Sequence, residues 1–304
     1  MKTLSMLSRL STVVAALMLF VLVSCQKESS LSAGNETVTE EEATTLSDES
    51  VQAEAGFDDV EDVSMLAAEE EGETSMYGRG EEASTGRLFP FAELRLRLGP
   101  CAEITVTPND STYPKTVTID FGPVGCLCAD GKYRRGAIII HLTAPIRRPG
   151  AVMTIALDSF YLNRAKIEGT KILSNLSENG NIKFTVQVVG GKVTHPNGRG
   201  YQYNSMKYVR QVEGGNTRPV RDDVFKIETR SSTQFNNGVT VNLNTETPLV
   251  KKTVCHWISD GKLKIRINSR VLFLDFGAPN NGDCDNKALL TWNNGANSRM
   301  ITLP

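Results

Sequence analysis

The residues that could carry out chemistry in this 304-residue chain are few and scattered. It contains three histidines, His141, His195 and His256, and none belongs to a metalloprotease or nucleophile motif. Cys255 and His256 are adjacent, so on a strand their side chains would point to opposite faces and could not form a nucleophile–base pair. We therefore predict no catalytic residue, no metal site and no cofactor.

Paired carboxylates are the other chemistry to consider. Asp222 and Asp223 could supply half of the acid pair used in glycoside hydrolysis, but neighbours on one strand face apart and no partner stands out. Asp283, Asp285 and Asn286 cluster in one loop without the number of ligands that calcium requires. An exported carbohydrate-active hydrolase therefore remains the alternative function, and a non-catalytic module is favoured.

The cysteines follow an internal repeat. Two strands run into Asp-Phe-Gly, at residues 120–122 and 275–277, and each motif has a cysteine on both sides. The repeat predicts disulfides Cys101–Cys126 and Cys255–Cys284, and the phenylalanine of each motif is expected to fill the core. Cys128 would then be the leftover thiol, although its position two residues after Cys126 would let either of them take the partner.

Aromatic and basic residues alternate in one passage and form a candidate binding face. Its members are Tyr201, Tyr203, Lys207, Tyr208 and Arg210. Rings beside cations could bind an anionic glycan. The same spacing is equally typical of a single row of rings that faces the core.

Apolar side chains alternate with period two at 182–188, 239–243 and 263–267, which predicts strands. We therefore expect strands to position the candidate residues described above. Asn-Gly and Gly-Gly turns separate such runs, and short turns join antiparallel neighbours. We predict an all-β body over residues 91–304, folded as an antiparallel sandwich or curved roll, either as one domain or as two similar subdomains.

The charges divide the chain into segments. Residues 26–90 hold 18 acidic and three basic residues, whereas residues 91–304 hold 17 acidic and 28 basic residues. Few apolar residues and a high net charge predict that 26–90 is a disordered acidic tether. The simplest expectation is a soluble spacer; a further hypothesis is that the tether shields an anion-binding face of the basic body.

The N-terminal segment, residues 1–25, predicts an export signal. Lys2 and Arg9 precede an apolar run, Val13–Val23, which is too short to span a bilayer. The run ends in Leu22–Cys25, which resembles the lipobox of bacterial lipoproteins, whose cysteine receives the lipid. The alternative is an ordinary cleaved signal peptide. Residues Gln26–Glu28 resemble a surface-export signal, which favours the cell surface over the periplasmic face.

Several passages of the body resemble one protein family. They are Ile119–Cys126, Asp130–Gly136, Thr247–Ile258 and Cys284–Ala288, and the resemblance extends over most of residues 101–304. The family consists of uncharacterised Bacteroidetes outer-membrane lipoproteins, in which a polar residue replaces Cys128. The resemblance implies an outer-membrane address and implies no activity.

Together these patterns predict a lipid-anchored lipoprotein of the bacterial outer membrane, acylated at Cys25, that acts as a binding or structural module. The membrane would be contacted through the lipid anchor. Further partners would be an anionic glycan or another envelope protein, and an exported address excludes nucleic acid as the natural ligand.

Overall fold

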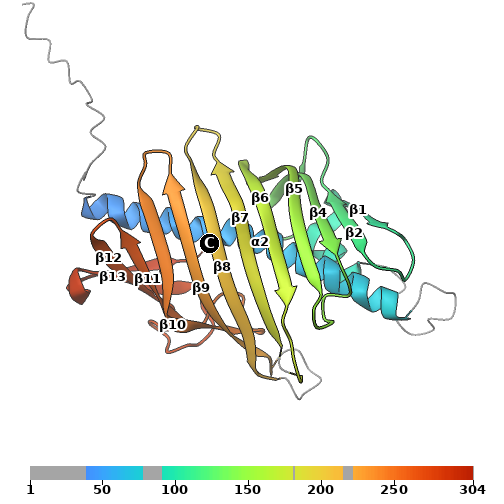
Figure 1. Ribbon diagram of the computed structural model, residues 1–304. Coiled ribbons are helices and arrows are strands. Elements are labelled where there is room, and N and C mark those ends of the chain that lie inside the picture. Colours follow the sequence, from blue (N-terminus) through green and yellow to red (C-terminus); the bar gives the residue numbers. More distant parts are fainter. Residues whose placement is uncertain (1–38, 78–90, 181, 215–221, 304) are drawn as a thin grey trace, which may run out of the picture. The chain divides into compact units, whose positions relative to one another are not determined.

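One antiparallel sheet makes up most of the body in the computed structural model, which describes residues 39–77, 91–180, 182–214 and 222–303. Within these residues the strands pair in sequence order from β1 to β14, and only β3 lies off this path, paired with β4 (Figure 1). The prediction of an all-β antiparallel body is confirmed. The described strands form a single sheet rather than the two packed sheets of a sandwich.

The described elements have the following bounds. The helices are α2 (Glu40–Tyr77) and α3 (Ala92–Leu98), with short 3-10 turns η1 (Gly99–Cys101) and η3 (Asn293–Gly295). The strands are β1 (Glu103–Thr107), β2 (Lys115–Asp120), β3 (Cys126–Leu127), β4 (Tyr133–Leu142), β5 (Val152–Leu162), β6 (Ala165–Asn175), β7 (Lys183–Thr194), β8 (Gly200–Glu213), β9 (Val224–Phe235), β10 (Thr240–Lys252), β11 (Asp260–Ile267), β12 (Arg270–Asp275), β13 (Lys287–Trp292) and β14 (Asn297–Thr302).

The acidic segment corrects a prediction. Residues 40–77 form the 38-residue helix α2 rather than part of a disordered tether. Thr39 and Glu42 begin the helix with a reciprocal capping box, in which the Thr39 N–H donates to Glu42 Oε2 (2.9 Å) and the Glu42 N–H donates to Thr39 Oγ1 (3.2 Å). Three glutamates in the first turn also stabilise the helix, because their negative charges lie at the positive end of its dipole. Residues 26–38 and 78–90 of the predicted tether lie outside the described residues.

One face of α2 is buried along almost its whole length. The buried positions recur at alternating intervals of three and four, so they form one stripe on the helix. The stripe comprises Ala43, Leu46, Ser50, Ala53, Phe57, Val60, Ser64, Ala67 and Glu71. Small residues let the helix approach the sheet closely, and α2 therefore belongs to the hydrophobic core. Among the described residues, no helix is long and apolar enough to cross a membrane.

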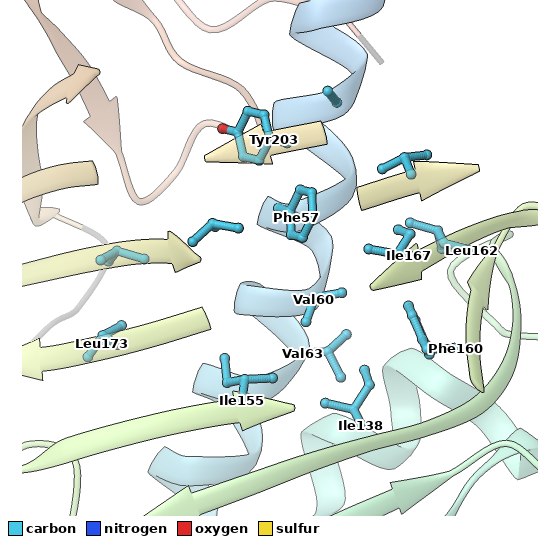
Figure 2. Close-up of a cluster of buried hydrophobic side chains, with 14 of the residues drawn as sticks. Phe57, Val60, Val63, Ile138, Ile155, Phe160, Leu162, Ile167, Leu173 and Tyr203 are labelled. Carbon is cyan, nitrogen blue, oxygen red and sulfur yellow. The ribbon is translucent and has the colours of Figure 1, made fainter. Parts of the chain in front are cut away.

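The core lies between α2 and the face of the sheet that contacts it, which we term the inner face. Figure 2 shows Phe57, Val60 and Val63 of α2 pointing into side chains from several strands. The ring of Phe57 stacks on that of Tyr203, with centroids 4.9 Å apart. Gly191 gives Phe57 its room, because a Cβ there would collide with the Tyr203 carbonyl oxygen and lie 3.0 Å from Phe57 Cζ.

The repeated Asp-Phe-Gly motif forms the same structure twice, at the ends of β2 and β12. In each copy the glycine N–H donates to the aspartate Oδ1, at 2.7 Å in the first copy and 3.0 Å in the second. Phe121 and Phe276 are both buried, as the repeat predicts. All described residues nevertheless belong to one compact unit, Val38–Pro304, so the repeat does not divide the body into two subdomains.

Candidate functional site

Charged side chains of α2 meet basic side chains of the sheet in order along the helix. Near the start of the helix, Asp48 binds Arg299 of β14 (2.5 Å). Near its end, Glu71 binds Lys115 of β2 (2.5 Å), and both of these side chains are fully buried. The helix therefore crosses the strands from one side of the sheet to the other (Figure 1). We term this set of contacts the ion-pair seam.

Arg134 of β4 is the centre of the seam. Its guanidinium is fully buried and donates to both oxygens of Asp59 on α2, at 2.9 Å each. It also donates to both oxygens of Asp130, at 2.8 and 2.7 Å. Arg97 (3.2 Å) and Lys132 (2.7 Å) bind Asp59 as well. Two carboxylates are thus shared by three cations, which keeps every buried charge compensated.

The pKa shifts of this cluster follow from these contacts. Burial alone would lower the pKa of Arg134, but hydrogen bonds from its guanidinium to Asp130 and the charge of Asp59 raise it instead. Burial would likewise raise the pKa of Asp130, and the hydrogen bonds and charge of Arg134 outweigh it and lower that pKa. Both groups are therefore held in their charged forms, which suits a structural ion pair rather than a group that exchanges protons.

A second cluster lies in the middle of the seam. Lys207 of β8 binds Asp58 (2.6 Å) and Glu54 (3.1 Å) of α2, and Lys171 of β6 binds Glu61 (2.5 Å). Burial would lower the pKa of Lys207, but Asp58 and Glu54 raise it well above its usual value. Lys207 is consequently held in its charged form and is not poised as a general base.

The predicted binding face is divided by the pleat of β8. Tyr201, Tyr203 and Lys207 point to the inner face and are buried against α2, whereas Tyr208 and Arg210 are exposed on the opposite face, which we term the outer face. Because the two groups lie on opposite sides of the sheet, they do not form a common surface. The alternative interpretation, a core-facing row of rings, is correct for Tyr201 and Tyr203.

The disulfides form as the repeat predicts. Cys101 pairs with Cys126 and Cys255 with Cys284, with Cα atoms 5.7 and 5.2 Å apart. Among the described cysteines, Cys128 is the free thiol and is buried. Burial raises the pKa of its thiol, so the unreactive protonated form is favoured. The sulfurs of Cys101, Cys126 and Cys128 lie within 4.8 Å of one another, but with two of them joined the group supplies fewer ligands than a tetrahedral soft-metal site needs.

The remaining candidates for catalysis are engaged separately. Asp223 Oδ1 accepts a hydrogen bond from Gln211 (2.8 Å). His141 lies 3.4 Å from Thr116 Oγ1 on the outer face of β4, and the ring of His256 packs edge-on against Trp257. Apart from the three sulfurs, the described residues hold no group of three or more side chains of the His, Cys, Asp and Glu types arranged to hold a metal ion. Cys25 lies outside the described residues.

An open groove on the outer face was not predicted from the sequence. It has a volume of about 450 Å³ and crosses strands β7 to β11. We term it the outer groove, and define it by the polar side chains that line it, Gln187, Asn204, Arg230, Asn242, Asn244 and Arg266. Its residues come from five strands, so only the register between those strands brings them together.

No protein-family model, curated protein or solved structure matches this chain.

Proposed function

We propose that this chain is an exported lipoprotein of the bacterial outer membrane, anchored by a lipid on Cys25 and serving as a non-catalytic binding or structural module. The sequence Leu22–Cys25 behind a short apolar run supports the anchor, and stable attachment by acyl chains requires more than one chain. Residues Gln26–Glu28 support the cell surface rather than the periplasmic face.

The observation that carries the non-catalytic role is the ion-pair seam. Ligand sites need an accessible hollow, and α2 covers the inner face of the sheet. The acids and bases found there neutralise one another, as Asp59 and Arg134 do. Catalysis needs titratable groups whose pKa values are moved towards neutrality, and the ion pairs of the seam move the pKa values of Asp130 and Lys207 away from it. Asp62 of α2 is an exception, because burial raises the pKa of its carboxyl to about 6.

The outer face is then the surface that remains for a partner. The seam pairs acids of α2 with inner-face cations, so these acids are not available to the outer face, where Arg230 and Arg266 are exposed. An anionic glycan or an acidic region of another envelope protein fits such a surface. Binding of this kind needs no rearrangement of the core.

Lipid attachment is tested by growing cells that express the full chain with a labelled fatty acid. We expect wild type to incorporate label and to sediment with outer membranes, and Cys25→Ala to do neither. Cys128→Ala is the matched control, because it removes the free thiol of the body and should leave labelling unchanged. Unlabelled wild type, or Cys25→Ala that still sediments with outer membranes, would contradict the anchor. Protease treatment of intact cells then shows whether the protein lies on the cell surface or on the periplasmic face of the outer membrane.

The non-catalytic role is tested separately on the purified chain. Incubation with a panel of neutral and acidic polysaccharides should release no new reducing ends. Sustained release that survives repurification would instead establish the hydrolase and would overturn this part of the proposal.

A further inference from the structure

The outer groove consists of two parallel rows of side chains on the outer face. One row runs from Gln187 through Met206 and Arg230 to Asn244, since these residues are directly opposite one another on successive strands. The adjacent row places Asn204 opposite Ser232, Ser232 opposite Asn242, and Asn242 opposite Arg266, as the following pairings show. Side chains two residues apart on a strand share a face, so the rows lie side by side.

The positive charge of the groove is not neutralised by the protein. Arg230 on β9 and Arg266 on β11 are both exposed, and neither forms an ion pair with a carboxylate within the described ranges. The described lining of the groove contains no acidic side chain. Glu228 belongs to the next row along β9, opposite Tyr208, and lies outside the lining. This differs from the inner face, where the cations of the seam bind acids of α2.

The amide side chains of the groove supply hydrogen bonds in both directions, because each has a carbonyl acceptor and an NH₂ donor. Asn204 is already oriented, since its Oδ1 accepts a hydrogen bond from the Gly190 N–H (3.1 Å) at the bulge of β7. Its NH₂ group is therefore left for a ligand. Val189 and Met206 add apolar surface between these polar groups.

We propose that the outer groove binds an oligosaccharide that carries carboxylate groups. Guanidinium groups bind carboxylates through paired charged hydrogen bonds, and amides suit the hydroxyl groups of a sugar. The apolar side chains suit the C–H face of a sugar ring. A shallow groove that crosses five strands accommodates an extended ligand. This proposal rests on the binding role proposed above and names the ligand class.

Binding is measured by calorimetry with the full-length, detergent-solubilised lipoprotein at 0.15 M ionic strength. The probes are a short oligogalacturonate, the neutral oligogalactose of equal length, and inorganic sulfate. We expect only the oligogalacturonate to bind. Arg230→Gln and Arg266→Gln should each weaken that binding by about tenfold, which corresponds to the loss of one charge-assisted hydrogen bond. Circular dichroism checks that each variant is folded.

Arg210→Gln is the matched control, because Arg210 is exposed on the same face and does not line the groove. It should leave affinity within about twofold, since an exposed charge of this kind is screened at that ionic strength. An equal loss in Arg210→Gln would mean unspecific attraction of polyanions and would overturn the proposal. Equal binding of the neutral oligosaccharide, full competition by sulfate, or no binding of oligogalacturonate would also overturn it. Fatty-acid labelling is measured independently, so failure of the groove is distinguishable from failure of the anchor.

Discussion

Asp59→Asn is the sharpest perturbation of the seam. The substitution keeps the size and shape of the side chain and removes its charge, while Arg134 stays fully buried. Removing one partner from a buried ion pair costs about 3 to 5 kcal/mol, because the other charge is left uncompensated. Arg134 keeps Asp130, at 2.7 Å, and this places the expected loss near the lower end, at about 3 kcal/mol.

The same substitution also affects Arg97 and Lys132, which share Asp59. Their side chains are 26% and 39% exposed, so water can solvate them and they add little to the cost. A loss of about 3 kcal/mol is a large part of the 5 to 15 kcal/mol that stabilises a typical protein. It should lower the melting temperature by roughly 6 to 12 °C in a domain of this size class.

The assay is urea unfolding at pH 7.5, followed by far-ultraviolet circular dichroism. Asp48→Asn is the matched control, because it is the same chemical change on the same helix opposite an arginine. Asp48 and Arg299 are 35% and 44% exposed, so the control should lose less than about 1 kcal/mol. If Asp59→Asn were no less stable than Asp48→Asn, the argument that buried charges hold α2 on the sheet would be refuted.

A double-mutant cycle separates the pair from its surroundings. Arg134→Met alone removes the buried partner of Asp59, which keeps only the partly exposed Arg97 and Lys132, whereas Arg134→Met combined with Asp59→Leu removes both members of the buried pair. We expect the double variant to be more stable than the sum of the two single losses, because neither change then leaves the other charge unpaired. Additive losses would show that the two side chains act independently.

Three further predictions test other parts of the fold. Phe57→Ala should destabilise the chain by about 3 to 5 kcal/mol in urea unfolding, because it empties a stacked, buried position; a loss below about 1 kcal/mol would contradict the packing. Asp130 has a lowered pKa, so its stabilisation is complete above the unfolded value of about 3.9 and is lost as pH falls through its lower folded value. Urea midpoints should therefore drop below about pH 4, and a drop already at pH 6 would count against this cluster. Cys126→Ser should redirect Cys101 to Cys128 in non-reducing peptide maps, since their sulfurs are within 4.8 Å; a free Cys101 would contradict it.

Local patterns were sufficient to predict the strands and the disulfides. Period-two alternation identified β7, where Val186 and Val188 are buried and Gln187 between them is exposed. The spacing of the cysteines around the repeated motif predicted both bridges, because the motif forms the same turn twice. The strands depend on residues close in sequence. The disulfides could be predicted because the cysteine spacing is similar in both copies of the repeat.

The five residues of the predicted binding face do not share one face of β8, and their numbering in the sequence already indicated this. Tyr201, Tyr203 and Lys207 are odd-numbered and Tyr208 and Arg210 even-numbered, so an extended strand without a bulge must place them on opposite faces. The outer groove, by contrast, could not be found from local patterns. Its side chains come from five strands, and a shift of one residue in any pairing would have turned that strand's groove residues inward.

Helix α2 was missed because its apolar signal is diluted. The buried stripe includes Ser50, Ser64, Glu71 and several alanines, so the mean hydropathy of any window of this segment is low. Two signals were present: the capping pair of Thr39 and Glu42, and the strict alternation of intervals of three and four. Both were outweighed by the density of acids, which on its own is typical of disorder.

The acids argue for disorder only if their counter-charges are absent, and the basic body supplies them. A single sheet with an apolar inner face needs a second layer to cover it. Residues 91–303, as far as they are described, offer only the seven-residue α3 and short turns beside the strands, so the longer cover must come from elsewhere in the chain. The acidic segment is the part whose charge complements the inner-face cations, from Lys115 at one end to Arg299 at the other. The opposite charges of the two segments therefore act together, and they select the face of the sheet that α2 covers.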